Sequence, residues 1–500
     1  MIGGLSKINR YLLAGAGAIG ILAAGVPAAS AQDLKEIQAQ IDSMQATIKS
    51  LQKQVEDAKA QAAAANAAAE SAGGSDLDLK VKWKGAPEFS SGDGKFKMKI
   101  RGRLQADYNA IDQDFNITGR PDVSAAELRR ARLGVEGVVF YTVEYKFEVD
   151  FANDEAAIKD AYLEYTGLAE DLGLRFGNFK TFNTLDDMTS SRFITFMERA
   201  ALVEAWGFDR QIGAAAIYAK DHYTLSAGIF GPPSATDEEW LEDVKTGAAR
   251  ITLAPINRDV NGVHQVVHLG ASWRDRDQAE HLRASNTTNA FADQFFRYRA
   301  RGADLHLADR FVSTPQIFDH DTFWGVEGAV IWGPWHVVGE YTQLEAEVSP
   351  LFLGSDPTYT GWYAETGWFL TGETRSYKHG EFGRIKVKNP VIGGGHGGGW
   401  GAWQIAGRYD VLDLSDKALT LQGNVAGLVG PTSVNCSLCG EQKTWLIGIN
   451  WWLNDYTRFQ FNYNESDING GPLFLANGSS ANRNDGANIK GFGMRAQVDW

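Results

Sequence analysis

The sequence predicts an all-β fold: a transmembrane antiparallel β-barrel of about 16 strands, preceded by an N-terminal periplasmic α-helical coiled coil. Stretches in which apolar and polar residues alternate recur from about residue 96 to the end of the chain. Before that stretch, apolar residues recur at alternating spacings of three and four. The composition combines 55 Gly, 15 Trp, 16 Tyr and 26 Phe with a mean hydropathy of -0.27, which suits a barrel better than a bundle of spanning helices.

Residues 1–31 have the features of a secretory signal peptide. Basic residues precede an apolar, Gly- and Ala-rich run over residues 11–24, and Ala29-Ser30-Ala31 supplies the small residues of a cleavage site. The run is too short for a membrane anchor, because a spanning helix needs about 20 apolar residues. We therefore expect export, with a mature protein that begins at Gln32.

Residues 32–72 are predicted to form the coiled-coil stalk. Its seam consists of Leu34, Ile37, Ile41, Met44, Ile48, Leu51 and Val55. The residue types at the two seam positions do not decide between two and three strands. The alternative is a lone amphipathic helix that lies on a surface. Residues 73–90, which begin with Gly73-Gly74-Ser75, are predicted to be a linker to a barrel domain over residues 91–500.

The strands follow from the period of two. Over residues 96–108 every even position is apolar or Gly and every odd position is polar or charged, which places one face on lipid and the other in water. The same alternation recurs over residues 144–151, and residues 324–341 form two such strands around a tight turn at Gly333-Pro334. The last strand ends at Trp500, on its apolar face, where a terminal aromatic resembles the signal that marks barrels for insertion.

The connections between strands distinguish a barrel from a soluble β-sandwich, which could show the same alternation. Short turns alternate with long polar segments, as expected when one rim of a barrel faces the periplasm and the other faces the outside. An even number of strands lets the ends of the sheet meet, and closure leaves no sheet edge unsatisfied in lipid.

Charge and cysteine content exclude some partners. The formal net charge is -14, and about -16 once the two basic residues Lys7 and Arg10 have left with the signal peptide, which argues against nucleic acid as a partner. Cys436 and Cys439 favour a loop disulfide over a metal site, because no further ligand cluster lies near them in the sequence. We expect no metal and no cofactor.

A cationic wall is predicted on the inner face, where the first, second and last strands meet. Its members are Lys97, Lys99, Arg101, Arg103, Arg130, Arg132 and Arg495. Side chains on one face of a strand recur about every 6.7 Å, so such a ladder could pass an anion from one weak site to the next. Acidic residues on the following strands, among them Glu148 and Asp150, leave open the alternative that these charges only pair across a wet wall.

Three long segments are candidates for folding into the lumen. Residues 181–210 stand between the fifth and sixth predicted strands and mix basic with acidic residues. Residues 372–399 are far longer than the turn expected there and hold five basic and two acidic residues, a net charge of +3. Residues 275–321 form a long external loop, whose alternative is a solvated surface loop. The inward basic candidates are Arg192, Arg199, Arg375, Lys378, Arg384, Lys386 and Lys388.

An enzymatic function is not expected. The alternation brings no Ser, His and acid grouping together on one rim, and His264 and His268 have no evident catalytic partner. A channel does no covalent work and selects by the charge and the width of its narrowest part.

Several motifs resemble the phosphate-selective porin O and P family. In chain order they are RRARLGVEG at 129–137, YKFEVDF at 145–151, KDAYLEY at 159–165, GNFK at 177–180, TFMER at 195–199 and WFLTGE at 368–373. The resemblance covers about residue 90 to Trp500. It implies a homotrimer of 16-stranded barrels, each with a pore that inward segments narrow and that Arg and Lys line. A homotrimer makes three strands the preferred interpretation of the coiled-coil seam.

These observations and the resemblance together predict a porin in the outer membrane of a Gram-negative bacterium. Small anions, phosphate or similar, would diffuse through its lumen, and the stalk would reach into the periplasm. The expected partners are two further copies of the chain, membrane lipid and small anions, and at the stalk peptidoglycan or periplasmic proteins. Two alternatives stay open: a weakly selective general porin whose lumen charges cancel, and a structural protein that tethers the envelope through its coiled coil.

Overall fold

The computed structural model divides the chain into two compact units, Met1–Leu77 and Asp78–Trp500. In the first unit, the described residues lie between 42 and 60, and all of them are helical. In the second unit, the described ranges are 79–83, 85–231, 245–277, 295–350, 355–393, 398–416, 439–471 and 484–500. Among the described residues, no helix has both the length and the apolar character needed to cross a membrane.

The predicted N-terminal features fall almost wholly outside the described residues. This holds for the signal peptide and for the seam positions Leu34, Ile37, Ile41, Met44, Ile48 and Leu51. Val55 is described; it is helical and 53% exposed. One exposed residue does not test a coiled coil, so the stalk stays a prediction.

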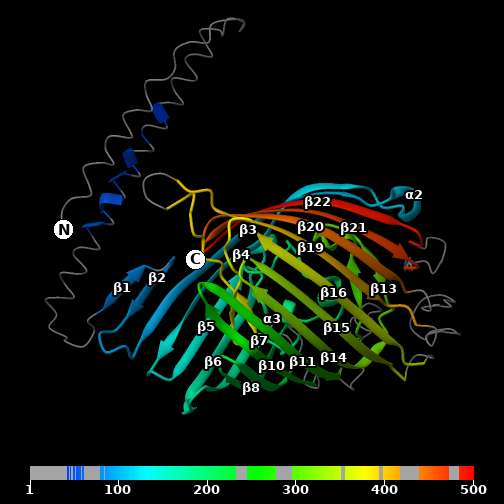
Figure 1. Ribbon diagram of the computed structural model, residues 1–500, viewed down its shortest axis with the longest axis horizontal. Coiled ribbons are helices and arrows are strands. Elements are labelled where there is room, and N and C mark those ends of the chain that lie inside the picture. The colour runs from blue at the N-terminus through cyan, green and yellow to red at the C-terminus, as the bar shows by residue number, and fades with distance from the viewer. Residues whose placement is uncertain are drawn as a thin grey trace, which may run out of the picture. The chain divides into compact units, whose positions relative to one another are not determined.

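The described strands of the second unit build an 18-stranded sheet, of which 16 strands form a closed ring (Figure 1). The first eight are β3 (Lys97–Asp112), β4 (Val123–Val139), β5 (Val143–Asp150), β6 (Ala157–Ala169), β7 (Leu172–Lys180), β8 (Arg210–Ala219), β9 (Tyr223–Phe230) and β10 (Lys245–Val260). The other eight are β11 (Val263–Asp277), β14 (Phe318–Trp332), β15 (Trp335–Val348), β16 (Thr358–Phe369), β19 (Ala402–Asp413), β20 (Glu441–Asn454), β21 (Thr457–Asn469) and β22 (Asn488–Asp499). Each strand pairs antiparallel with the next, and β22 closes on β3 with Asp499 opposite Arg103. The predicted 16-stranded antiparallel barrel is confirmed.

The ring has a rim of short turns and a rim of long loops. The start of β3 and Trp500 lie at the turn rim, together with the two-residue turns Asn261-Gly262 and Gly333-Pro334. Asn261 and Gly262 have φ values of 52° and 79°, which fit the turn type that joins twisted antiparallel strands in a tight hairpin. At the loop rim the connections include the short helices α2 (Phe115–Thr118) and η2 (Ala152–Asp154).

The remaining two strands of the sheet, β1 (Lys80–Trp83) and β2 (Pro87–Ser90), form a hairpin at the turn rim. β2 pairs with the start of β3, where Ser90 lies opposite Lys97. This hairpin occupies part of the range 73–90 that was predicted as a linker. The difference has a physical reason, because Lys80-Val81-Lys82-Trp83 alternates polar and apolar residues as a strand does.

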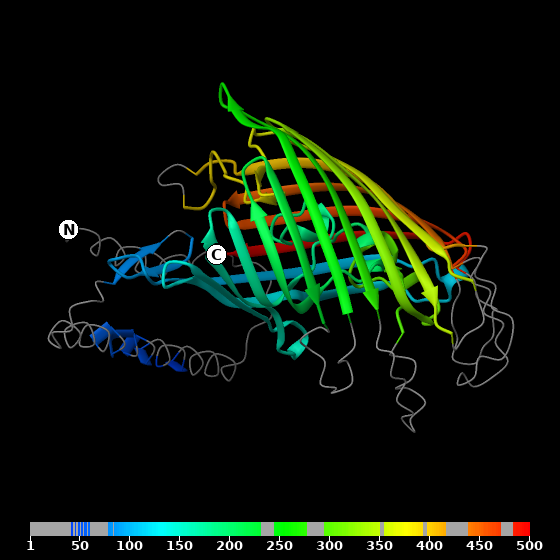
Figure 2. The same cartoon turned by 90° about the horizontal axis from the view of Figure 1, so that it is seen from below.

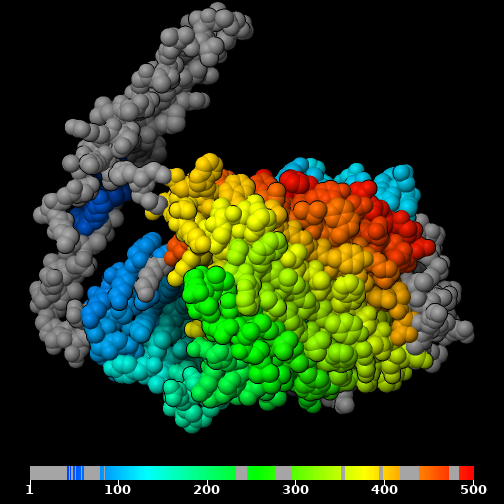
Figure 3. Space-filling model, in the orientation of Figure 1, coloured from blue at the N-terminus to red at the C-terminus, as the bar shows by residue number. Residues whose placement is uncertain are grey.

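The outer surface carries two belts of aromatic side chains. Near the turn rim, Trp335 stacks on Trp368 with 5.0 Å between ring centroids. A second belt includes Trp324, whose ring centroid lies 5.6 Å from that of Tyr341. Trp324 stands eight residues before Trp332 on β14. Eight residues span roughly 27 Å along a strand, or about 20 Å along the axis of a barrel whose strands tilt by about 40°. Figure 3 shows that side chains close the gaps between the strands of the wall that faces the viewer. The distance between the belts suits a band that faces lipid.

Described parts of three segments lie inside the barrel (Figure 2). Residues 181–209, between β7 and β8, contain α3 (Leu185–Met188) and α4 (Ala201–Ala205). The segment between β11 and β14 contains β12 (Arg299–Arg301), η5 (Gly302–Asp304) and β13 (Arg310–Ser313). The segment between β16 and β19 contains the small hairpin of β17 (Ser376–Lys378) and β18 (Glu381–Gly383). Trp206 and Tyr298 pack at 6.1 Å within the largest buried apolar cluster, which joins the first two segments.

Cys439 lies near the loop rim, just before β20. Cys439 is buried and disulfide-bonded, and its carbonyl oxygen accepts a hydrogen bond from the Ser313 N–H at 3.1 Å. Cys436 lies outside the described residues, so the pairing of these two cysteines stays a prediction.

Candidate functional site

The segment 181–209, called the lumen loop below, is fastened to one side of the barrel. Asn450 Nδ2 donates a hydrogen bond to the Thr195 carbonyl oxygen at 2.9 Å, and Arg458 Nη1 donates to the Ile194 carbonyl oxygen at 2.8 Å. These wall residues belong to β20 and β21. The lumen loop therefore closes that side of the barrel, and the open space lies on the side of β3–β8.

Glu198 is the main ionic anchor of the lumen loop. Its carboxylate lies 2.8 Å from Arg129 Nε, 3.6 Å from Arg130 Nη2 and 2.7 Å from Arg495 Nη2. Burial acts to raise the pKa of the Glu198 carboxyl, but the three guanidinium groups outweigh burial and hold this pKa well below its usual range. Glu198 is thus ionised at neutral pH, and it ties the loop to β4 and β22.

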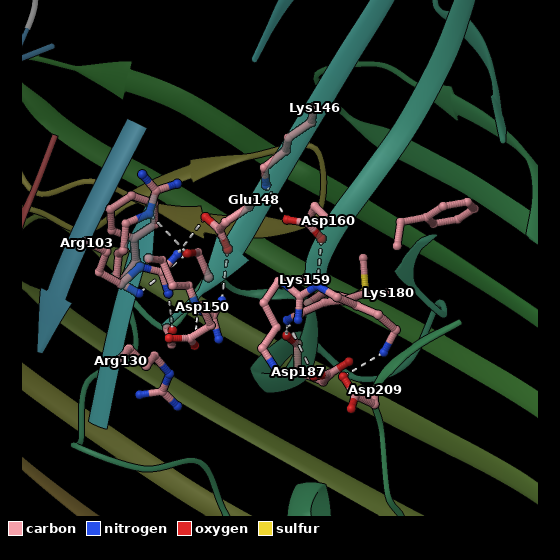
Figure 4. Close-up of a pocket in the computed structure, with 18 of the residues that line it drawn as sticks. Arg103, Arg130, Lys146, Glu148, Asp150, Lys159, Asp160, Lys180, Asp187 and Asp209 are labelled. Atoms are coloured by element: carbon pink, nitrogen blue, oxygen red, sulfur yellow. Dashed lines mark hydrogen bonds and ion pairs between the residues drawn. The ribbon is translucent and has the colours of Figure 1, made fainter. Parts of the chain in front are cut away.

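A cavity of about 530 Å³, called the central cavity, lies between the lumen loop and β3–β8 (Figure 4). Eleven basic and six acidic side chains line it, a formal net charge of +5 for the lining residues alone. Some of these cations, such as Arg129, Arg175 and Arg192, also pair with carboxylates that lie just outside the lining. The basic residues are Arg103, Arg129, Arg130, Arg132, Lys146, Lys159, Arg175, Lys180, Arg192, Arg199 and Arg210. The acidic residues are Glu148, Asp150, Asp160, Asp187, Asp209 and Glu381.

Several carboxylates of the central cavity are each shared by two cations. Asp160 lies 2.6 Å from Arg210 Nε and 2.5 Å from Lys146 Nζ. Glu148 lies 3.0 Å from Arg132 Nη1 and 3.6 Å from Arg103 Nη2. Around Asp160 one carboxylate neutralises one charge of two, whereas Arg132 also pairs with Asp150 at 2.7 Å, so that Arg132 and Arg103 have two carboxylates between them. The excess of positive charge in the lining follows from its eleven cations and six carboxylates. In a narrow space with low-dielectric walls, this excess raises the local concentration of anions.

Two β-bulges add charge to the central cavity. The register of β4 against β3 skips Arg129, so that Arg129 and Arg130 both turn inward. The register of β6 against β5 shifts in the same way and turns both Lys159 and Asp160 inward. A bulge inserts one extra residue into a strand and breaks the alternation locally.

Lys159 and Arg199 differ from the other cations of the central cavity. Among the described residues, neither forms an ion pair with a carboxylate, whereas their neighbours do. Arg199 donates hydrogen bonds to the carbonyl oxygens of Asp186 at 2.8 Å and Thr189 at 2.7 Å, which orient the guanidinium without neutralising it. An incoming anion can therefore bind Lys159 or Arg199 without displacing a carboxylate.

A second cavity of about 210 Å³ lies toward the loop rim and is called the loop-side cavity. Its charged lining consists of Arg129, Arg130, Arg199, Arg301, Asp187, Glu198, Glu204 and Asp304, four basic and four acidic residues. It shares five lining residues with the central cavity, namely Arg129, Arg130, Asp187, Arg199 and Phe208. The two spaces are thus adjacent, and the loop-side cavity carries no net charge.

A third cavity of about 430 Å³ lies toward the turn rim and is called the turn-side cavity. Its charged lining consists of Arg175, Arg250, Lys378, Glu144, Glu164, Asp171 and Glu381, a net charge of -1 with His379 neutral. It shares Arg175, Met188 and Glu381 with the central cavity. The three cavities therefore form a series between the two rims, with net charges of 0, +5 and -1.

The residues of the predicted cationic wall separate into two groups. Those that line the central cavity are Arg103, Arg130 and Arg132. Those that do not are Lys97, Lys99, Arg101 and Arg495. Arg101 pairs with Glu136 at 2.9 Å, nearer the turn rim. The Arg495 side chain has 0% exposure, because Asp107 at 2.6 Å and Glu198 at 2.7 Å enclose its guanidinium. The part that each residue plays in transport stays a prediction.

The predicted basic residues of the inward segments are also spread over different places. Arg192 and Arg199 line the central cavity, and Lys378 lines the turn-side cavity. Arg375 is buried between Glu365 at 3.2 Å and the Thr195 hydroxyl at 2.8 Å. Outside the three cavities lie Arg384, Lys386 and Lys388.

The candidates named from the sequence omit six basic residues of the central cavity. They are Arg129, Lys146, Lys159, Arg175, Lys180 and Arg210. Lys146 and Arg175 stand on the polar phase of their strands, so a full count of inward positions on every strand would have included them. Arg129 and Lys159 enter through bulges, which leave no signal in the alternation.

Comparisons with known proteins agree with this architecture. A family model described as "Phosphate-selective porin O and P" matches residues 98–500. Porin O of Pseudomonas aeruginosa is 28% identical over 411 residues, which cover 77% of this chain and 86% of that protein. An uncharacterised protein of Caulobacter vibrioides is 32% identical over 409 residues, which cover 78% of this chain and 72% of that protein.

Solved structures with a similar arrangement of strands include an anion-selective porin from Comamonas acidovorans. It has a TM-score of 0.47 and 10% sequence identity, and the match covers 81% of this chain and 100% of that chain. A trimer form of OmpT from Vibrio cholerae has a TM-score of 0.46 and 12% identity, over 81% of this chain and 99% of that chain.

Proposed function

Because the chain belongs to the phosphate-selective porin O and P family, we propose that it is an outer-membrane porin through which small anions, phosphate or similar, diffuse passively. The observation that carries this proposal is the net charge of +5 on the central cavity, which stands in series with two nearly neutral cavities. The family and the barrel fold indicate a channel rather than an enzyme.

The proposed path of an anion runs through the three cavities in turn. At the loop rim the anion meets Arg129, Arg130 and Arg199, which line both the loop-side and the central cavity. Guanidinium groups donate paired hydrogen bonds to oxyanions, so phosphate suits these residues. Lys159 then offers a compact point charge. Arg175 lines both the central and the turn-side cavity, so the anion can pass from one cavity to the other along its guanidinium group.

A weakly selective general porin is the second candidate. The observation that favours it is the pairing of most central cations with carboxylates, since an ion-paired wall attracts anions less than a bare one. The two candidates differ in how the pore responds to phosphate.

Phosphate titration of a chloride current separates the two candidates. The mature chain is inserted into a planar bilayer in dilute KCl, and phosphate is added in steps up to millimolar concentration. An anion pore that binds oxyanions in the central cavity should lose chloride current as phosphate occupies it. A chloride current that stays constant over the whole titration would support the general porin and contradict a phosphate-binding path.

We also propose that the barrel assembles into a homotrimer through the outer face of β3–β10. Every residue of these strands is described, and none is Trp, whereas the Trp residues of the aromatic belts lie on β11–β20. The exposed aromatic side chains of β3–β10, such as Tyr108 and Tyr165, are Tyr and Phe. Aromatic belts mark wall that meets the lipid interface. Alanines such as Ala216 and Ala227 are exposed on this face, and small side chains allow two walls to approach closely.

A further inference from the structure

The hairpin of β17 and β18 occupies the border between the central and the turn-side cavity. It belongs to the segment between β16 and β19, which is far longer than the two-residue turns at Asn261-Gly262 and Gly333-Pro334. Phe382 lines the central cavity, and Lys378 and His379 line the turn-side cavity. Glu381 lines both.

The tip of the hairpin is held against the barrel wall. Arg250 Nη2 on β10 donates a hydrogen bond to the Gly380 carbonyl oxygen at 2.8 Å. A Cβ atom at Gly380 would come within 2.8 Å of Thr252 Oγ1, so the backbone lies directly on the wall. The Tyr377 hydroxyl lies 2.8 Å from His268 Nδ1 on β11. These contacts fix the position of the residue that follows the tip, Glu381.

The base of the hairpin is fastened to the lumen loop. Arg375 Nη2 donates a hydrogen bond to the Phe193 carbonyl oxygen at 3.1 Å, and its guanidinium lies 3.8 Å from the ring centroid of Phe382. The barrel wall holds one side of the hairpin and the lumen loop holds the other. The side chains of the hairpin are thus fixed in position.

Glu381 has a different environment from the other carboxylates of the central cavity. Asp160 and Glu148 each lie within 3.0 Å of a cation, whereas the Glu381 carboxylate forms no hydrogen bond and no ion pair among the described residues. Its companions at the border of the two cavities are Arg175 and Met188. Arg175 already pairs with Glu164 at 2.6 Å. The border therefore holds a carboxylate that no described cation contacts directly, and the cations that act on it, chiefly Arg250 and Lys180, do so from beyond ion-pair distance.

We propose that Glu381 is a specificity-determining residue that makes this border the main barrier to anions in the pore. The inference rests on the proposed function, since it assumes that anions pass from the central to the turn-side cavity. An anion leaving the cation-rich central cavity must pass a fixed carboxylate at close range, and a cation at the turn rim is attracted by the same charge. Glu381 thus lowers the anion preference that the central cavity creates.

The test compares Glu381→Gln with Glu144→Gln. Glu144 lines the turn-side cavity but not the central one, so both substitutions remove one carboxylate from the same cavity. We expect Glu381→Gln to raise the anion-to-cation permeability ratio by about two- to five-fold in 0.1 M KCl, and Glu144→Gln to change it by less than half as much. Glu381→Ala removes the same charge with a smaller side chain, so we expect the same permeability ratio. It replaces Glu381→Gln in the experiment if the glutamine variant fails to insert.

The outcomes separate this inference from the proposed function. If the unsubstituted chain prefers cations, the proposed function fails. If the unsubstituted chain prefers anions, but neither variant of Glu381 raises the ratio above that of Glu144→Gln, the barrier at Glu381 is refuted while the anion pore stands.

Discussion

Lys159 gives the clearest view of how single residues set the charge of this pore. It faces the central cavity because a bulge in β6 turns two consecutive side chains inward. Its partner in that bulge, Asp160, is already engaged by Lys146 and Arg210, and Lys159 forms no ion pair among the described residues, although Asp209 acts on its charge from beyond ion-pair distance. An anion can approach this ammonium group without competing with a carboxylate.

Replacing Lys159 with Gln should therefore lower the anion preference. One unit charge at about 4 Å in water is worth about 1 kcal/mol, or roughly five-fold in local anion concentration, and salt reduces the effect. We expect a two- to five-fold lower anion-to-cation permeability ratio in dilute KCl, measured from reversal potentials. Lys95→Gln is the matched control, because Lys95 packs on Phe96 and Phe140 outside the three cavities. Equal effects of the two substitutions would contradict a special position for Lys159.

The inward direction of Arg103, Arg130 and Arg132 could be predicted, because all three stand on the polar phase of an alternating strand. The inward direction of Arg129 and Lys159 could not, because a bulge depends on how two strands pair and not on the residues of one strand. The burial of Arg495 was equally out of reach, since it needs Glu198 from a loop almost three hundred residues earlier.

At the scale of the elements, the lumen loop decides which side of the barrel is open. It is tied to β20 and β21 through its carbonyl groups and to β4 and β22 through Glu198. Among the residues that the structure describes, Glu198 is the one whose carboxylate pairs with Arg129, Arg130 and Arg495 together. Without it, three guanidinium groups would face one another in a partly buried site.

Replacing Glu198 with Gln should loosen the lumen loop at neutral pH. Removing one partner of a buried ion pair costs on the order of 3 kcal/mol, because Arg129 and Arg130 lose the carboxylate that they share, while Arg495 keeps Asp107. We expect single-channel currents that flicker between levels in place of one steady level. Glu136→Gln is the control, since Glu136 pairs with Arg101 near the turn rim and does not contact the loop. A steady current in the Glu198 variant would contradict this anchoring role.

The same anchor predicts a pH dependence of definite sign. The folded-state pKa of Glu198 is lowered, so its stabilisation is complete above the ordinary glutamate pKa of about 4.3 and is lost only as pH falls through the lower folded value. The unsubstituted pore should thus keep its steady current from pH 7 down to about pH 4.5. Flicker that begins above that pH would show that another group holds the loop.

Which segments fold inward could be narrowed from the sequence, but how they pack could not. The unusual length of the turn between β16 and β19, and its net charge of +3 over residues 372–399, singled it out. The contacts that hold these segments, such as Arg458 with Ile194 and Trp206 with Tyr298, join residues far apart in the chain. Local propensity does not specify such contacts, because they form only after the barrel brings its strands together.

At the scale of the whole molecule, the alternation of apolar and polar residues was enough to predict the barrel. It set the strand count near 16, and the pairing of β22 with β3 confirms the closure. The uneven distribution of Trp over the outer wall gives the further expectation that β3–β10 meet other copies of the chain.

A pair of matched substitutions tests this interface. Ala216 on β8 and Ala364 on β16 are both exposed on the outer face, one on each side of the barrel. Ala216→Trp should disrupt the trimer, because a bulky ring keeps two closely packed walls apart, whereas Ala364→Trp should face lipid and leave assembly unchanged. Native mass spectrometry in detergent reports the number of copies. A trimer that survives Ala216→Trp and not Ala364→Trp would place the interface on the opposite wall.

The account depends most on the excess of positive charge in the central cavity, and the reversal potential tests this directly. A single pore of the mature chain is placed between 1 M and 0.1 M KCl, and the voltage of zero current is read. We predict a reversal potential of the sign that corresponds to chloride preference. Its magnitude should grow toward the chloride equilibrium potential as both solutions are diluted, because dilution reduces the screening of the pore's charges. A reversal potential of the opposite sign would contradict the account, whatever the pore is found to carry.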